Sequence, residues 1–165
     1  MINIRLATYN DLDKLEEIFL AAKQTMRKDG NLYQWTEVDY PICYTKNDIK
    51  KGTCYVVEDN GEITATFVYQ LGEEPTYKII DNGNWLNDDP YATIHRIASN
   101  GTTKDIFGIM LKFAKQFNVD IRIDTSEDNK RMTHLIKKHN FIYCGTIYIR
   151  DGSPRDAYQK RKEDL

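Results

Sequence analysis

Residues 121–159, IRIDTSEDNKRMTHLIKKHNFIYCGTIYIRDGSPRDAYQ, carry the most specific pattern in the chain. The first of them alternate between apolar and polar side chains, which indicates a strand. From Ser126 to Asn140, apolar residues recur at helical spacing, so a helix is expected there. Two β-rich runs follow and flank the turn-forming residues Asp151 to Pro154. The segment therefore predicts a strand, a helix and two further strands.

The chain before residue 121 alternates between strand-like and helix-like patterns. The expected elements are a strand at Ile2–Ala7, a helix at 10–26 capped by Asn10 or Asp11, a short helix at 45–52, two strands around Asn60-Gly61, a strand at Tyr91–Ser99 and a helix from Lys104. Asn-Gly between two β-rich runs is a strong signal of a tight hairpin. Strands interleaved with helices, together with an antiparallel hairpin, predict an α/β fold (α+β in its mixed sheet) with helices on both faces.

Length and composition limit what the chain can be. With 165 residues and no repeat or linker, residues 1–165 are expected to form a single domain. The net charge of −2 argues against a nucleic-acid partner, because such proteins usually carry a basic excess. No apolar run approaches the roughly 20 residues that span a bilayer, and no secretion signal is present, so no membrane partner is expected. Cys43, Cys54 and Cys144 are widely spaced and odd in number, which predicts no metal site and a reduced, cytoplasmic location.

The order of elements and the C-terminal residues together resemble the GNAT superfamily of acetyl-CoA-dependent N-acetyltransferases. The residues that match the family's C-terminal run are Asp124, Thr125, Asn129, Met132, Leu135, Phe141, Cys144 and Gly145. The resemblance covers nearly the whole chain. It implies a GNAT-like central, mostly antiparallel sheet with two splayed strands, and acetyl-CoA as co-substrate. The amine of a small molecule or peptide would attack the thioester directly.

The resemblance also implies where the cofactor binds. The backbone of Ile97 and Ala98 would bind the pantetheine arm, and the loop into the next helix would bind the pyrophosphate. That loop comprises Gly101, Thr102, Thr103, Lys104, Asp105, Ile106 and Phe107. Aligned with the family's loop, Q/R-x-x-G-x-G/A, Thr102 replaces Gln or Arg, and Asp105 and Phe107 replace the small residues.

Three cofactor-binding residues leave alternatives open. Asp105 would either face a phosphate unfavourably or point outward and cap the helix, and Lys104 could offset its charge. Asn129 matches an Asn that commonly touches the pantetheine arm. The alternative for Asn129 is a helix N-cap or a surface position.

The catalytic groups are less clearly indicated than the cofactor site. Many family members have a Tyr that protonates the departing thiolate, but this chain has Ile136 there, so Tyr143, Tyr148 or Tyr91 would have to replace it. His95 is a candidate base for deprotonating an ammonium group, because imidazole side chains titrate near neutral pH. Because neighbours alternate along a strand, His95 would instead pack inward if Arg96 pointed into the cleft.

The acceptor pocket is expected to include Trp35 and Tyr40, from a loop that resembles the acceptor-lining loop of one bacterial branch, and Tyr91. The alternative for the loop aromatics is that they only anchor the loop. The leading interpretation is an acyltransferase. The second is a GNAT-fold module that binds CoA or a partner protein without efficient transfer. A homodimer is an open alternative for the oligomeric state.

Overall fold

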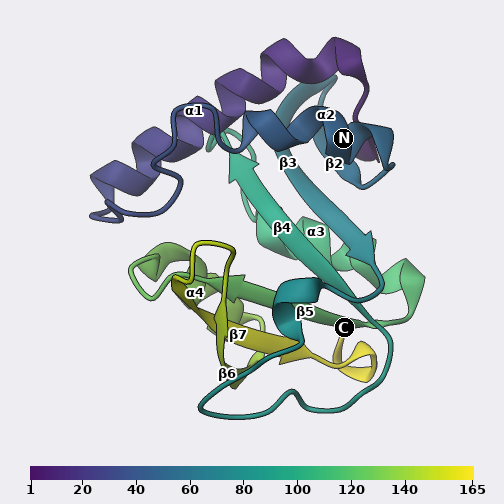
Figure 1. The fold of residues 1–165 in the computed structure, drawn as a ribbon. Coiled ribbons are helices and arrows are strands. Elements are labelled where there is room, and N and C mark those ends of the chain that lie inside the picture. The colour runs from purple at the N-terminus through teal and green to yellow at the C-terminus, as the bar shows by residue number, and fades with distance from the viewer. The chain divides into compact units, whose positions relative to one another are not determined.

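The computed structural model describes residues 1–165. Its strands are β1 (Ile2–Leu6), β2 (Cys54–Asp59), β3 (Glu62–Leu71), β4 (Tyr91–Ser99), β5 (Asp120–Thr125), β6 (Ile142–Tyr148) and β7 (Pro154–Lys160) (Figure 1). Its α-helices are α1 (Leu12–Lys28), α2 (Ile42–Lys50), α3 (Ile106–Ala114) and α4 (Lys130–Lys138). Short 3₁₀ helices are η1 (Tyr9–Asp11), η2 (Pro75–Tyr77), η3 (Lys115–Phe117) and η4 (Lys162–Asp164). The order of strands and α-helices is the predicted one.

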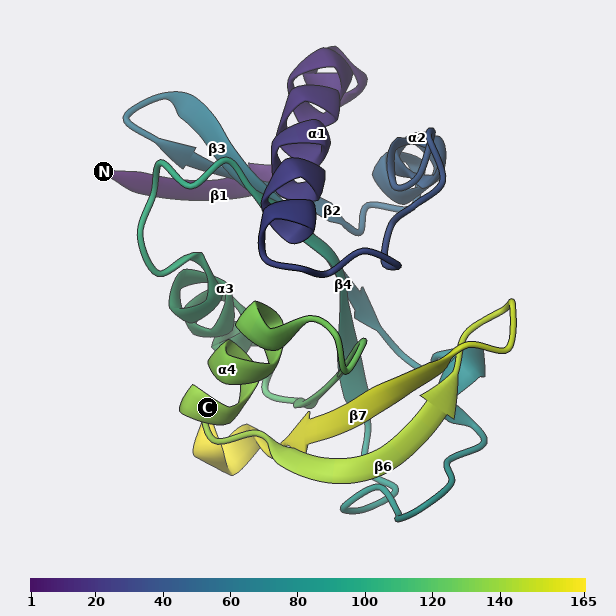
Figure 2. The same ribbon diagram turned by 90° about the vertical axis from the view of Figure 1, so that its left-hand side faces the viewer.

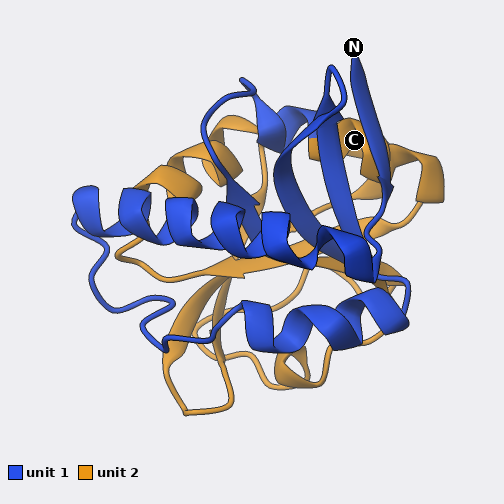
Figure 3. Cartoon of the chain, turned by 90° about the horizontal axis from the view of Figure 1, so that it is seen from above, with its two compact units in different colours: residues 1–69, 95–109 blue, residues 70–94, 110–165 orange.

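The seven strands form a sheet in the order β1-β2-β3-β4-β5-β7-β6. The pairs β1–β2, β2–β3, β5–β7 and β6–β7 are antiparallel, whereas β4 and β5 are parallel. The predicted mixed α/β fold with a mostly antiparallel sheet is thus confirmed. By its internal contacts the chain divides into unit 1, residues 1–69 and 95–109, and unit 2, residues 70–94 and 110–165 (Figure 3).

Unit 1 contains the β1–β2–β3 meander, and α1 lies across it (Figure 2). Residues Asn60 and Gly61 join β2 to β3 and both have a positive φ, of 52° and 85°. That conformation matches the tight hairpin turn predicted for Asn-Gly. The apolar face of α1 is buried in a core cluster with residues of β2 and β4; the cluster includes Leu15, Ile18, Phe19, Val56 and Ala98. This packing fixes the second half of β4 beneath α1.

Unit 2 contains β5, β6 and β7, with the segment from Leu71 to Tyr91 beside them. The buried Tyr77 of η2 packs in a core cluster with Tyr91 and Ile147, and its hydroxyl donates to Asp124 Oδ2 at 2.6 Å. Helix α4 is followed by Asn140 with φ +62°. Asn therefore supplies the left-handed helix end for which Gly is the usual residue.

Three local predictions need correction. Helix α2 begins at Ile42 rather than at residue 45, because Pro41 and Asp39 supply carbonyls to its first amides. Helix α4 begins at Lys130 rather than at residue 126, because Ser126 and the two residues after it form a turn. Asp11 occupies the N-cap position of α1, but its carboxylate accepts hydrogen bonds from other groups and none from the α1 amides.

Candidate active site

The second half of β4 holds several of the predicted site residues, and it is not a regular strand. Arg96 has φ +48°. A left-handed backbone is uncommon for a residue other than glycine and unusual within a strand. It interrupts the regular alternation on which the opposite orientation of His95 and Arg96 was predicted. Both residues are half-buried, and the opposite orientation of their side chains stays a prediction.

The guanidinium of Arg96 makes a two-point ion pair with Asp48 of α2. Nε donates to Oδ2 at 2.9 Å and a terminal nitrogen donates to Oδ1 at 2.8 Å. The side chains are only 17% and 8% exposed. Burial raises the pKa of Asp48, and the nearby Arg96 opposes that shift without cancelling it. The ion pair therefore has good hydrogen-bond geometry, but its attraction does not fully offset the cost of removing the Asp48 carboxylate from water.

A row of aromatic rings extends from this pair into the segment between α1 and α2. The Arg96 guanidinium lies 5.4 Å from the ring centre of Tyr44. Tyr44 contacts Tyr40 edge-on at 5.6 Å, Tyr40 contacts Trp35 at 5.9 Å, and Trp35 contacts Phe19 at 6.0 Å. The two loop aromatics predicted for the acceptor pocket are thus grouped with β4 in unit 1.

Hydrogen bonds order the loop between β4 and α3. The Gly101 amide donates to Ser99 Oγ, and the Thr102 amide donates to Asn100 Oδ1, each at 3.0 Å. The Thr103 hydroxyl donates to Asp59 Oδ2 at 2.8 Å and shares a hydrogen bond with Thr64. The loop is thereby attached to both strands of the β2–β3 hairpin.

Asp105 ends this loop and caps α3. Its Oδ1 accepts from the Gly108 amide at 3.2 Å, and its carbonyl accepts from the Ile109 amide at 3.0 Å. Of the two alternatives for Asp105, facing a phosphate or capping the helix, these contacts are those of a helix cap. The amides of Thr103 and Lys104 make no hydrogen bond within the protein. Backbone amides at the start of a helix are donors of the kind that bind anions, so these two are candidates for the predicted pyrophosphate contact.

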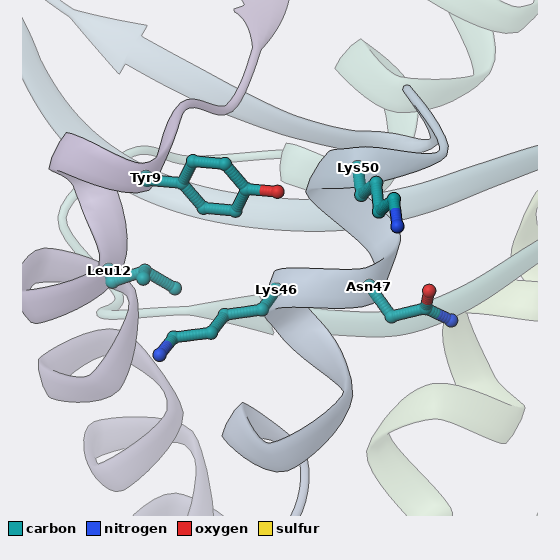
Figure 4. Close-up of a pocket in the computed structure, with 5 residues that line it drawn as sticks. All are labelled: Tyr9, Leu12, Lys46, Asn47 and Lys50. Carbon is teal, nitrogen blue, oxygen red and sulfur yellow. The ribbon is translucent and has the colours of Figure 1, made fainter.

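An open pocket of about 480 Å³ lies beside α2, lined by Tyr9, Leu12, Lys46, Asn47 and Lys50 (Figure 4). At about 100° per residue, Lys46 and Lys50 lie on the opposite side of the helix from Asp48. The pocket and the Arg96–Asp48 ion pair therefore involve opposite faces of α2.

No family model matches the chain. A solved acetyltransferase of the GNAT family from Streptococcus agalactiae is 32% identical over 97% of this chain and 95% of that one, with a TM-score of 0.87. The chain belongs to the GNAT superfamily.

Two further relatives show how far the similarity extends. A solved GNAT-family acetyltransferase from Listeria monocytogenes has 18% identity over 97% of this chain and 94% of that one, and its TM-score of 0.72 shows a shared fold. The S-(2-succino)cysteine N-acetyltransferase of Bacillus subtilis is 30% identical over 88 residues. That match spans 52% of this chain and 52% of the relative, about half the length of each.

The unusual loop of this GNAT protein keeps one property of the family's glycine. Asp105 has φ +56°, in the left-handed region that Gly favours and that Asp tolerates better than most residues. Phe107, at the second small-residue position, is 3% exposed, so its ring packs into the interior. The backbone shape at Asp105 is retained, while the charge there differs.

The remaining predicted residues lie in unit 2. Asn129 is the N-cap of α4, and its Oδ1 accepts from the Met132 amide at 3.0 Å. Tyr143 is half-exposed on β6 and contacts Tyr158 edge-on. Tyr91 is 9% exposed, and its hydroxyl accepts from the Glu74 amide. The Tyr148 hydroxyl donates to Asp81 Oδ2 at 2.9 Å. The pantetheine, catalytic and acceptor roles of these residues remain predictions.

Asp48 and Tyr44 were not among the residues predicted for the site. Both lie on α2, and each contacts Arg96. Their spacing of four residues places them on one face of the helix, which is a signal that the sequence contains. The partner on β4 lies 48 residues further along the chain, and no local pattern specifies that pairing.

Proposed function

We propose that the protein is an acetyl-CoA-dependent N-acetyltransferase that acts on the primary amine of a small molecule or peptide. The observation that carries this proposal is the segment β4–loop–α3. It combines a left-handed residue in β4, loop amides without partners at Thr103 and Lys104, and the glycine-like backbone of Asp105. Membership of the GNAT superfamily supports the same activity.

In this proposal the cofactor lies along β4 and the loop. The backbone of Ile97 and Ala98 binds the pantetheine arm, and Asn129 contacts the arm. The loop from residue 101 to Phe107 binds the pyrophosphate, with the amides of Thr103 and Lys104 as the available donors. When bound, acetyl-CoA supplies an activated acyl group. The chain's contribution is to hold the thioester and to exclude competing orientations of the amine.

The transfer itself is a direct attack. The amine nitrogen forms a bond to the acetyl carbon, the carbon–sulfur bond breaks, and the departing thiolate takes a proton. His95 is proposed to accept the proton of the ammonium group, and Tyr143 to protonate the thiolate. Trp35, Tyr40 and Tyr91 are proposed to contact the acceptor.

The nature of the acceptor is tested with a panel of amines. The Bacillus subtilis relative is named for S-(2-succino)cysteine, so the panel includes that amino acid, cysteine, a polyamine and short peptides. Release of CoA thiol is followed with each amine, and binding of acetyl-CoA is measured separately by thermal shift. Turnover with any amine supports the proposal, whereas binding without release by any amine supports the CoA-binding module instead. No thermal shift at millimolar acetyl-CoA would contradict both functions.

Further parts of the proposal concern the protein as a whole. We assign residues 1–165 to one N-acetyltransferase domain with a cytoplasmic location. The free state of Cys43, Cys54 and Cys144 is consistent with that compartment. None of the helices has the length and apolar composition that a membrane span requires. The oligomeric state, with a homodimer as one alternative, is measured by light scattering. A mobility-shift assay tests the expectation that no nucleic acid binds.

A further inference from the structure

The backbone conformation of Arg96 is exceptional within this chain. Seven residues other than glycine have a positive φ, and five of them are Asn or Asp, which tolerate it. The other two are Trp35 and Arg96, and only Arg96 lies within a strand. A long side chain without such tolerance keeps this conformation only where its surroundings impose it.

The surroundings of Arg96 can impose it, because its side chain is held at several points. Both oxygens of Asp48 accept hydrogen bonds from the guanidinium, and the Tyr44 ring lies against it. Asp48 is itself fixed, since its carbonyl accepts from the amide and the hydroxyl of Thr53. The forked geometry of the pair specifies the direction of the Arg96 side chain and not only its charge.

The second exceptional residue belongs to the same group of side chains. Trp35, with φ +57°, contacts Tyr40, and Tyr40 contacts Tyr44. The Trp35 carbonyl accepts from Arg27 at 2.9 Å, which holds the loop in place. The loop aromatics and the left-handed residue of β4 are therefore joined through α2.

We propose that Arg96 and Asp48 form a positioning pair for acetyl transfer. By holding residue 96 in the left-handed conformation, the pair sets the direction of the His95 side chain and of the Ile97 backbone on either side of it. It also fixes α2, and through Tyr44 the loop aromatics, relative to β4. This inference rests on the proposed function and concerns the same site. Neither residue of the pair has to touch the reacting atoms.

The substitution Asp48→Asn tests the pair and has a matched control. Arg5 and Asp11 form a second two-point pair in unit 1, at 2.8 and 3.0 Å, which joins β1 to η1. We expect Asp48→Asn to lower kcat by about tenfold or more, because small displacements of reacting groups are costly. The acetyl-CoA dissociation constant should stay within about twofold, and Asp11→Asn should leave kcat within about twofold. All rates are compared at an equal folded fraction, measured by circular dichroism.

A second pair of variants tests the backbone conformation itself. Glycine accepts a positive φ without strain and alanine does not, so Arg96→Gly should retain several-fold more kcat than Arg96→Ala. A purely stabilising ion pair would give equal losses in kcat for the two variants at an equal folded fraction. Arg96→Lys should not retain the wild-type kcat, since a single ammonium cannot make the two parallel hydrogen bonds.

A crystal structure of the Asp48→Asn variant separates this inference from the proposed function. If residue 96 leaves the left-handed region, the pair holds it there, even if the wild-type protein transfers acetyl to no amine. In that case only the proposed function fails. If residue 96 keeps its positive φ, or if Asp48→Asn and Asp11→Asn change kcat equally, the positioning role is wrong.

Discussion

Two arginine–aspartate pairs in unit 1 have nearly the same hydrogen-bond lengths and different surroundings. Arg5 and Asp11 are joined by hydrogen bonds of 2.8 and 3.0 Å, and Arg96 and Asp48 by hydrogen bonds of 2.8 and 2.9 Å. The Arg5 side chain is 35% exposed, whereas that of Arg96 is 17% exposed. The first pair joins β1 to η1, and the second joins α2 to β4. Their aspartate side chains are almost equally buried, at 11% and 8% exposed.

The comparison shows that geometry alone does not decide what a pair contributes to stability. The hydrogen bonds from Arg5 lower the pKa of Asp11, so folding favours the charged carboxylate. Burial raises the pKa of Asp48 despite Arg96, so folding disfavours its charged form. A buried pair of this kind is weak evidence for stability and is better explained by the position it imposes.

The largest difference should appear when each arginine is removed. Arg96→Ala leaves the Asp48 carboxylate buried without its partner, and it should lower the free energy of unfolding by about 3–5 kcal/mol. Urea denaturation of the variant checks this. The double variant Arg96→Ala/Asp48→Ala should regain a large part of the loss, because no unpaired charge remains. A double variant no more stable than Arg96→Ala would show that the loss has another cause.

The corresponding change in the pair with the more exposed arginine should cost less. Arg5→Ala leaves the Asp11 carboxylate with hydrogen bonds from the Thr8 amide and hydroxyl, so a loss of about 1 kcal/mol is expected. The same denaturation experiment measures it. An equal cost for Arg5→Ala and Arg96→Ala would remove the distinction between the pairs.

Asp105 is a third carboxylate in unit 1. It accepts a hydrogen bond from the Gly108 amide, whereas Asp11 and Asp48 each accept from an arginine. Asp105→Asn keeps a side chain that can cap α3 and tolerate φ +56°, but it removes the negative charge beside the amides proposed to bind phosphate. CoA binding should strengthen by about 1 kcal/mol, roughly fivefold, measured by isothermal titration at low salt. Asp13→Asn, which changes an exposed carboxylate on α1 away from the loop, is the control for overall charge. An unchanged affinity in Asp105→Asn would show that the carboxylate points away from the phosphates.

The smallest expected effect is on how stability depends on pH. The pKa of Asp11 is lowered in the folded protein, so its contribution is present above its unfolded pKa and is lost as the pH falls through the folded pKa. The pKa of Asp48 is raised, so its contribution decreases as the pH rises from the unfolded pKa through the folded pKa. The stability of the wild type relative to Asp11→Asn should therefore rise with pH. Relative to Asp48→Asn it should fall. Denaturation curves between pH 3 and 7 distinguish the two slopes, and slopes of the same sign would contradict the assignment.

Local chemistry allowed much of the fold to be predicted. The turn at Asn60-Gly61 and the left-handed helix end at Asn140 follow from residues that favour a positive φ. Periodicity gave the order of the elements. By contrast, the start of α2 depends on carbonyls in the preceding loop, which no helical pattern reports.

The candidate site was less predictable because its decisive features are tertiary. Arg96 is a residue type that gives no signal of a left-handed backbone, and its conformation accompanies a contact with Asp48 on another element. The role of Asp105 could be predicted only in part. Capping was one of two alternatives from the sequence, and the contact with Gly108 selects it.

That contact also has a consequence for how this loop could change by mutation. A methyl group on Gly108 would clash with the Asp105 carboxylate, so alanine there would displace the carboxylate from the Gly108 amide. Alanine is otherwise the better helix former by about 1 kcal/mol. The two positions are therefore epistatic: Gly108→Ala costs the cap while Asp105 is present, and brings only its gain in helix propensity once a smaller residue has replaced Asp105. A route from this loop to one with a glycine at position 105 therefore has a preferred order of steps, in which the carboxylate is lost before Gly108 changes.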